Sequence, residues 1–139
     1  MFFKKEGYAL IELLITFFIL MLFFTVLIVS IPNFFNKLNT NFFAIQVYND
    51  LANARDLALS LDKDATCMIT PTSFKIYLDS ELVKEIKIPL SIKVSSTANI
   101  IGFKGASGFT KFAGTITFSF KNYVKTISLG VGFGKLTLK

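Results

Sequence analysis

The sequence has 139 residues, 53% of them hydrophobic and 17% charged, which fits a single domain and is too apolar for a disordered chain. Residues 8–31 hold one charge, Glu12, whereas residues 32–139 hold 13 Lys and Arg against 7 Asp and Glu. One cysteine and no histidine exclude an internal disulfide and histidine-based triads, and leave too few ligands for a zinc site. We therefore expect no metal, no cofactor and no enzymatic activity, and we expect Cys67, in an apolar stretch, to be buried and inert.

The first element is an apolar helix over residues 8–31, about 36 Å long at ~1.5 Å per residue and thus able to cross a ~30 Å hydrocarbon core. Lys4 and Lys5 precede it, and no charge follows until Lys37. This asymmetry predicts a single-pass protein of the cell membrane, with a cytoplasmic N-terminus and the C-terminal part outside. A cleaved secretory signal fits poorly, because the apolar run is too long and Val29–Phe34 lacks a small-x-small cleavage site.

Glu12 lies five residues into this apolar run. A carboxylate inside a membrane helix costs on the order of 2.5–3.5 kcal/mol on insertion scales. It is either a tolerated charge near the cytoplasmic interface or a group paired with a cation in the apolar phase.

Residues 4–14, Lys-Lys-Glu-Gly-Tyr-Ala-Leu-Ile-Glu-Leu-Leu, resemble the class III signal of type IV pilins and pseudopilins. The resemblance implies a leader of residues 1–7, cleavage between Gly7 and Tyr8 by a prepilin peptidase, and N-methylation of Tyr8. Glu12 is then the fifth mature residue, as in the family, and would pair with the terminal amine of a neighbouring subunit to set the register of a filament. The family commonly has Phe and Thr where this chain has Tyr8 and Ala9.

The same resemblance implies the partners of the chain. They are the prepilin peptidase, other pilins or pseudopilins, an inner-membrane assembly platform and the lipid bilayer. The protein would reach the cell surface when assembled in a pilus.

Beyond Pro32 the pattern is that of an amphipathic helix over residues 33–61, ending near residues 62–64. Its polar positions are Gln46, Asn49, Asn53, Asp56 and Ser60. Its apolar positions are Ala44, Val47, Tyr48, Leu51, Ala54, Ala58 and Leu61.

The rest of the chain alternates in the manner of strands separated by turns. The expected strands are residues 66–70, 74–78, 82–89, 92–94, 100–103, 114–120, 123–129 and 135–138, with a hairpin turn at residues 121–122. We therefore predict an α+β fold in which an antiparallel sheet covers the amphipathic helix, with residues 32–139 as one extracytoplasmic domain. This is the pilin-like architecture that the N-terminal motif implies.

Residues 54–58, 101–105, 114–118 and 127–136 further resemble minor pseudopilins, which include the type II secretion H-type subunit, its type IV pilus relatives and the competence-pilus minor pilins of Gram-positive bacteria. The leading expectation is a minor subunit of a competence or twitching pilus that helps to initiate or tip the filament. The alternatives are a type II secretion pseudopilin and a membrane-anchored binding protein that does not polymerise.

Two further patterns concern binding. The glycines at positions 130, 132 and 134 lack the Lys-Ser/Thr ending of a phosphate-binding loop and indicate a bend between strands. The net positive charge outside the membrane is compatible with DNA, anionic cell-wall polymers or acidic lipid. A DNA-binding patch, if present, would consist of Lys121, Lys125, Lys135 and Lys139, on the expected terminal hairpin.

Overall fold

The computed structural model describes residues 3–139, with side chains from Tyr8 onward except at positions 29 and 30. The chain divides into two compact units, the first ending at Phe35 and the second covering Asn36–Lys139. The described residues form one helix and nine strands, joined by turns and loops. They are α1 (Phe3–Leu61), β1 (Ala65–Ile69), β2 (Ser73–Leu78), β3 (Glu81–Lys87), β4 (Lys93–Ser96), β5 (Ile100–Phe103), β6 (Thr110–Phe112), β7 (Gly114–Phe120), β8 (Tyr123–Leu129) and β9 (Leu136–Leu138).

The second half of α1 is amphipathic as predicted. Its buried positions recur at steps of four and three residues, and its predicted polar positions are all exposed. Three of the buried residues are alanines, which let strands approach the helix axis closely. The most deeply buried positions, each at most 1% exposed, are Thr40, Ala44, Val47, Leu51, Ala54 and Ala58.

The helix ends at Leu61, close to the predicted boundary. Asp62 takes a left-handed conformation with a φ of 51°. The N–H of Lys63 then donates to the carbonyl of Ala58 over 3.1 Å, which is the long bond of a Schellman motif. This motif turns the chain from the helix into β1.

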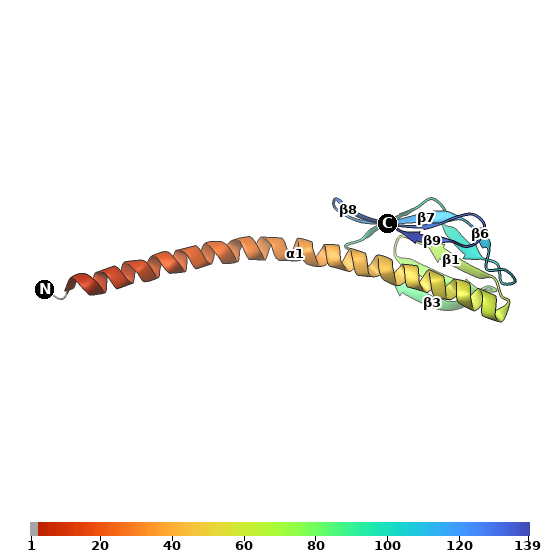
Figure 1. Ribbon diagram of the computed structural model, residues 1–139, viewed down its shortest axis with the longest axis horizontal. Helices are drawn as coiled ribbons and strands as arrows, with labels where there is room; N and C mark the ends of the chain where they lie inside the picture. Colours follow the sequence, from red (N-terminus) through yellow and green to blue (C-terminus); the bar gives the residue numbers. More distant parts are fainter. Residues whose placement is uncertain (1–2) are drawn as a thin grey trace. The chain divides into compact units, whose positions relative to one another are not determined.

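All strand pairs are antiparallel, and the strands form two sheets where the sequence analysis expected one. Sheet A has the order β3-β2-β1-β5-β6, and sheet B has the order β4-β7-β8-β9. In Figure 1 the strands lie beside the C-terminal part of α1. The inner faces of both sheets and the buried face of α1 share one hydrophobic core, in which Phe43 of the helix meets Phe118 of β7 edge to face at 5.5 Å.

The chain passes between the two sheets three times, and the last passage occurs at Ala113, which alone separates β6 in sheet A from β7 in sheet B. Gly114 begins β7 at a point where a Cβ atom would lie 2.8 Å from a methyl carbon of Ile101. Only glycine lets the chain change sheets in this space. The strand β6 has three residues and two of them are exposed, so it carries no alternating pattern, and the sequence analysis did not predict it.

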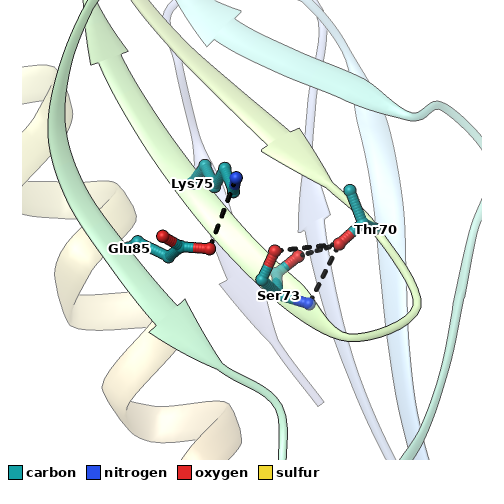
Figure 2. Close-up of polar contacts among 4 residues, drawn as sticks. All are labelled: Thr70, Ser73, Lys75 and Glu85. Carbon is teal, nitrogen blue, oxygen red and sulfur yellow. Dashed lines mark hydrogen bonds and ion pairs between the residues drawn. The ribbon is translucent and has the colours of Figure 1, made fainter.

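The β1–β2 connection is held by side-chain hydrogen bonds, which Figure 2 shows. The hydroxyl of Thr70 donates to the carbonyl of Ser73 over 2.8 Å and accepts from its N–H over 2.9 Å. Lys75 of β2 and Glu85 of β3 are partners across the strands, with Nζ and Oε1 3.3 Å apart. These contacts fix the register between neighbouring strands of sheet A.

Candidate assembly and binding surfaces

The N-terminal part of α1 presents an apolar surface along its described side chains between positions 8 and 31, with Glu12 as the one charged group among them. Its most apolar 18-residue window has a mean hydropathy of 2.9, and none of that window is buried within the chain. The hydroxyls of Thr16 and Thr25 donate to carbonyls of the preceding helical turn, over 2.8 to 3.0 Å. Each hydroxyl is thus hydrogen-bonded within its own helix. This suits an apolar environment, where a hydroxyl without a hydrogen-bond partner is energetically costly. A single N-terminal apolar helix of this kind fits a membrane anchor.

The helix carries the predicted assembly residues on one face. Tyr8, Ile11, Glu12 and Ile15 line one hollow on its surface, as expected for residues three and four positions apart. Tyr8 is 79% exposed, and Glu12 is exposed as well. Both groups are therefore open to a neighbouring molecule.

The predicted leader, residues 1–7, lies partly outside the described residues, because residues 1 and 2 are not described. Helix α1 begins at Phe3 and continues through Gly7 and Tyr8 without interruption. The predicted cleavage bond thus lies within helical backbone.

The globular unit contains a polar contact between α1 and β3 that the sequence analysis did not single out. Asp50 is 7% exposed, and its Oδ1 accepts a hydrogen bond of 2.6 Å from Nζ of Lys84. Asp50 Oδ2 is buried without a partner. The spacing along the helix indicates this burial, because Asp50 follows buried Val47 by three residues and precedes buried Ala54 by four, so it lies on the same face.

Lys84 reaches the helix because it lies on the inner face of β3, opposite Ile76. A register shift at Ile76/Tyr77 accompanies this placement. β3 is an edge strand of sheet A. An inward-facing lysine and a bulge are two devices by which proteins prevent edge strands from pairing with other chains.

Cys67 lies at the centre of the core, in β1, with no exposed surface. Burial raises the pKa of its thiol to about 12, and the nearby carboxylate of Asp50 adds to this rise. The thiol is therefore protonated at neutral pH, which confirms the prediction that it is buried and supports the prediction that it is inert.

The four lysines of the predicted DNA patch lie on different sides of sheet B. Lys121 is in the β7–β8 turn, with its Nζ 5.6 Å from the ring centre of Phe120. Lys125 is paired with Phe118 and shares the inner face with Ile127. Lys135 and Lys139 flank β9 and alternate with inward-facing Leu136 and Leu138, so they belong to the outer face. The structure thus brings Lys135 and Lys139 to one face and separates Lys125 from them.

The glycine-rich segment at residues 130–134 forms the bend between β8 and β9, as predicted. The N–H of Gly130 donates to the carbonyl of Lys135 over 3.1 Å, and Thr110 donates through its N–H to Gly132 and through its hydroxyl to Gly130. The bend exposes 91% of Val131 and 82% of Phe133. Among the described residues no group of three or more Cys, Asp or Glu side chains could hold a metal ion.

Comparison with solved structures identifies this architecture. Two crystal structures of the type IV minor pilin FimU from Pseudomonas aeruginosa match with TM-scores of 0.58 and 0.56. Each match covers 69% of this chain and 84% or 89% of the FimU chain, at 12% and 14% sequence identity. The chain has the fold of a type IV minor pilin.

No family model matches the sequence, and no curated protein matches it. The pilin fold is therefore visible in the structure at an identity where sequence comparison finds no relative. It confirms the predicted α+β architecture of a long N-terminal helix that continues into an amphipathic helix packed on antiparallel strands.

Proposed function

We propose that the chain is a minor structural subunit of a type IV-like filament. The observation that carries this proposal is the combination of the pilin fold with an exposed apolar helix whose single charge, Glu12, is the fifth residue after Gly7. In this proposal the N-terminus is cytoplasmic before processing, and the globular unit is outside. The subunit performs no chemistry of its own.

Assembly would use the face of α1 that carries Tyr8 and Glu12. Cleavage after Gly7 creates a free α-amino group at Tyr8, and the carboxylate of Glu12 in one subunit pairs with this amine in the next. An unpaired carboxylate in an apolar helix bundle is unfavourable, so pairing favours one axial register between subunits. The other apolar side chains of residues 8–31, all exposed where described, then pack between helices of the filament core.

The experiment that tests this proposal is processing by a prepilin peptidase. Co-expression with the enzyme should make Tyr8 the new N-terminus. The intact mass of the chain should fall by the mass of residues 1–7, less the methyl group that N-methylation of Tyr8 adds. Gly7→Val should abolish the change, whereas Ala9→Ser, two residues beyond the bond, should not. A chain that keeps Met1, or that is cut near position 30, would contradict the proposal.

The pilus role and the secretion pseudopilus role share all of these features. They differ in the filament that incorporates the subunit, which co-purification with either set of major subunits distinguishes. A membrane-anchored binding protein that never polymerises would appear in neither filament. A contribution to DNA uptake stays a prediction based on net charge, and duplex DNA is therefore included among the ligands in the binding experiment that follows.

A further inference from the structure

The positive charge of the chain is concentrated in its last part. After Glu85 the sequence contains eight lysines and no Asp or Glu, whereas residues 1–85 contain all nine acidic residues. This acid-free part provides all four strands of sheet B. Sheet B therefore has no acidic side chain of its own to pair with its lysines.

The outer face of sheet B can be read from its strand register. Ile116 and Phe118 of β7 and Ile127 and Leu129 of β8 are buried and define the inner face. The residues between them face outward. On the four strands these outward positions carry seven hydroxyls, which belong to Ser95, Thr115, Thr117, Ser119, Thr126, Ser128 and Thr137.

These hydroxyls are arranged in rows across the strands. Thr117 has Ser95 on one side and Thr126 on the other, and Thr126 exchanges both backbone hydrogen bonds with Lys139, each of 2.9 Å. A neighbouring row runs from Thr115 through Ser128 to Thr137. We call these outward positions, with the lysines at their borders, the hydroxyl face.

Three exposed lysines border the hydroxyl face. Lys93 is on β4, opposite Ser119, and Lys135 and Lys139 flank β9 at the other edge. The face is about 14 Å wide, since neighbouring strands lie ~4.8 Å apart. Positive charge thus lies at both edges of a surface made mostly of hydroxyl groups, which also includes the apolar side chain of Val124 opposite Ser119.

We propose that the hydroxyl face binds a linear polyol phosphate, that is, a polymer of hydroxyl-bearing units joined by phosphodiesters. The lysines supply point charges for the phosphates, and the serine and threonine hydroxyls lie between the lysines, where the hydroxyl-bearing units of the polymer would lie. Thr115 already donates to the hydroxyl of Ser128 over 3.3 Å, and Ser119 donates to the carbonyl of Lys93 over 3.4 Å. The other five hydroxyls can donate to and accept from the hydroxyls of the polymer units. The charge of the face is complementary to the phosphates of such a chain at both of its edges.

Nucleic acid fits this surface less well. A four-stranded sheet about 14 Å wide does not enter a major groove ~12 Å wide, which admits a helix or a two-stranded ribbon. Single-stranded DNA is bound without sequence preference by stacking on aromatic side chains, and the hydroxyl face carries none. DNA would meet the face through its phosphates alone, without using the array of hydroxyls.

The test uses the full chain in non-ionic detergent micelles, with labelled poly(glycerol phosphate), neutral dextran and a 20-bp DNA duplex as probes. Fluorescence anisotropy at low and at physiological salt should show binding of the polyol phosphate and none of dextran. The triple variant Lys93→Gln, Lys135→Gln, Lys139→Gln should weaken binding at least about tenfold, since it removes the lysines that attract an anionic ligand at both edges of the face. The control triple Lys37→Gln, Lys63→Gln, Lys87→Gln makes the same change in net charge elsewhere and should weaken it much less.

A second variant separates hydroxyl recognition from charge. Thr117→Val with Thr126→Val keeps the side-chain shape and every lysine but removes two facing hydroxyls, and should weaken polyol phosphate binding on the order of tenfold. Duplex binding should not change in this variant. The proposal is overturned by absence of polyol phosphate binding at low salt, by equal losses in the two lysine triples, or by an unchanged affinity of the double valine variant. It is also overturned if the duplex binds as tightly as the polyol phosphate, which would identify a surface for polyanions in general. The test requires no filament, so its failure leaves the proposed structural role intact.

Discussion

At the scale of single residues, burial decides what Cys67 can do. The thiol has no exposed surface and a pKa raised to about 12, so almost none of it is thiolate at neutral pH. We expect no reaction with a maleimide or a disulfide reagent under native conditions, and complete reaction in denaturant. A mass spectrum showing native labelling within minutes would contradict the burial of this side chain. Lys84→Gln changes a side chain of β3 and leaves Cys67 inside the core, so it should not speed the labelling of Cys67 in the folded protein.

Asp64 makes the stability of the folded state depend on pH in the acid range. Its Oδ2 is 2.6 Å from Nζ of Lys111 and its Oδ1 accepts from the N–H of Gly105, and these bonds, Lys111 first, lower the pKa of its carboxyl. A group whose pKa is lower in the folded state stabilises that state fully above its unfolded pKa, and loses this contribution as the pH falls through its folded pKa.

The Asp64 contribution is therefore present at neutral pH and disappears in acid. Lys111→Gln should lower the unfolding temperature at pH 7 and make less difference as the pH falls through the folded pKa of Asp64. The loss should be small, because partly exposed ion pairs contribute at most about 1 kcal/mol. Circular dichroism melts at pH 7 and in acid check this, with Lys87→Gln as the control, since Lys87 is exposed and is not among the groups that shift the pKa of Asp64. A deficit that persists unchanged in acid would assign the effect of Lys111 to something other than this pair.

At the scale of elements, the pair of Asp50 and Lys84 joins α1 to the edge strand β3. Removing Lys84 leaves a buried carboxylate without its partner, and the side chain of Lys84 is 46% exposed, so water offsets part of the loss. We expect Lys84→Gln to lower the free energy of unfolding by about 1–2 kcal/mol. The double variant Asp50→Asn, Lys84→Gln should recover part of it, because no charge remains buried.

Denaturant unfolding of the wild type, Asp50→Asn, Lys84→Gln and the double variant forms a thermodynamic cycle that measures the coupling between the two side chains. The exposed ion pair of Arg55 and Asp56 offers a control, since its groups are 3.4 Å apart and Asp56 is 67% exposed. Equal effects of Lys84→Gln in the presence and absence of the Asp50 carboxylate would show that the pair contributes nothing.

The helices and strands also show how much of the fold can be predicted from the sequence. The apolar helix, the amphipathic helix and its end followed from hydropathy and spacing, because each burial pattern repeats within one helix. Most strands followed from alternation. The strand β6 did not, since its three residues are mostly exposed, nor did the change of sheet at Ala113, which depends on packing around Gly114.

At the scale of the whole molecule, the site is less predictable than the fold. Tyr8 and Glu12 could be placed together from their spacing on one helix. The hydroxyl face could not, because it needs the register that sets Thr117 beside Ser95 and Thr126, residues from three strands. The same register separates Lys125 from Lys135 and Lys139, which lie close in sequence but on opposite faces.

The two units of the chain suit a division of roles. In the proposed function, the exposed apolar helix is the part that inserts into the membrane and assembles, whereas the globular unit holds its own core and its own charged surface. Assembly through α1 and binding through sheet B should therefore be separable by mutation. Substitutions on the hydroxyl face should leave filament incorporation unchanged.

Incorporation into filaments tests the structural role most directly. The tagged chain is expressed in cells that contain a prepilin peptidase and major pilins, and it is quantified in sheared filaments and in membranes. The wild-type chain should appear in filaments with Tyr8 as its first residue. Glu12→Ala should be processed and inserted normally, because it makes the helix more apolar, yet be depleted from filaments about tenfold or more. Leu13→Ala, which removes no charge, should incorporate like the wild type. Equal incorporation of Glu12→Ala and wild type, or absence of the wild-type chain from filaments, would contradict assembly through Glu12.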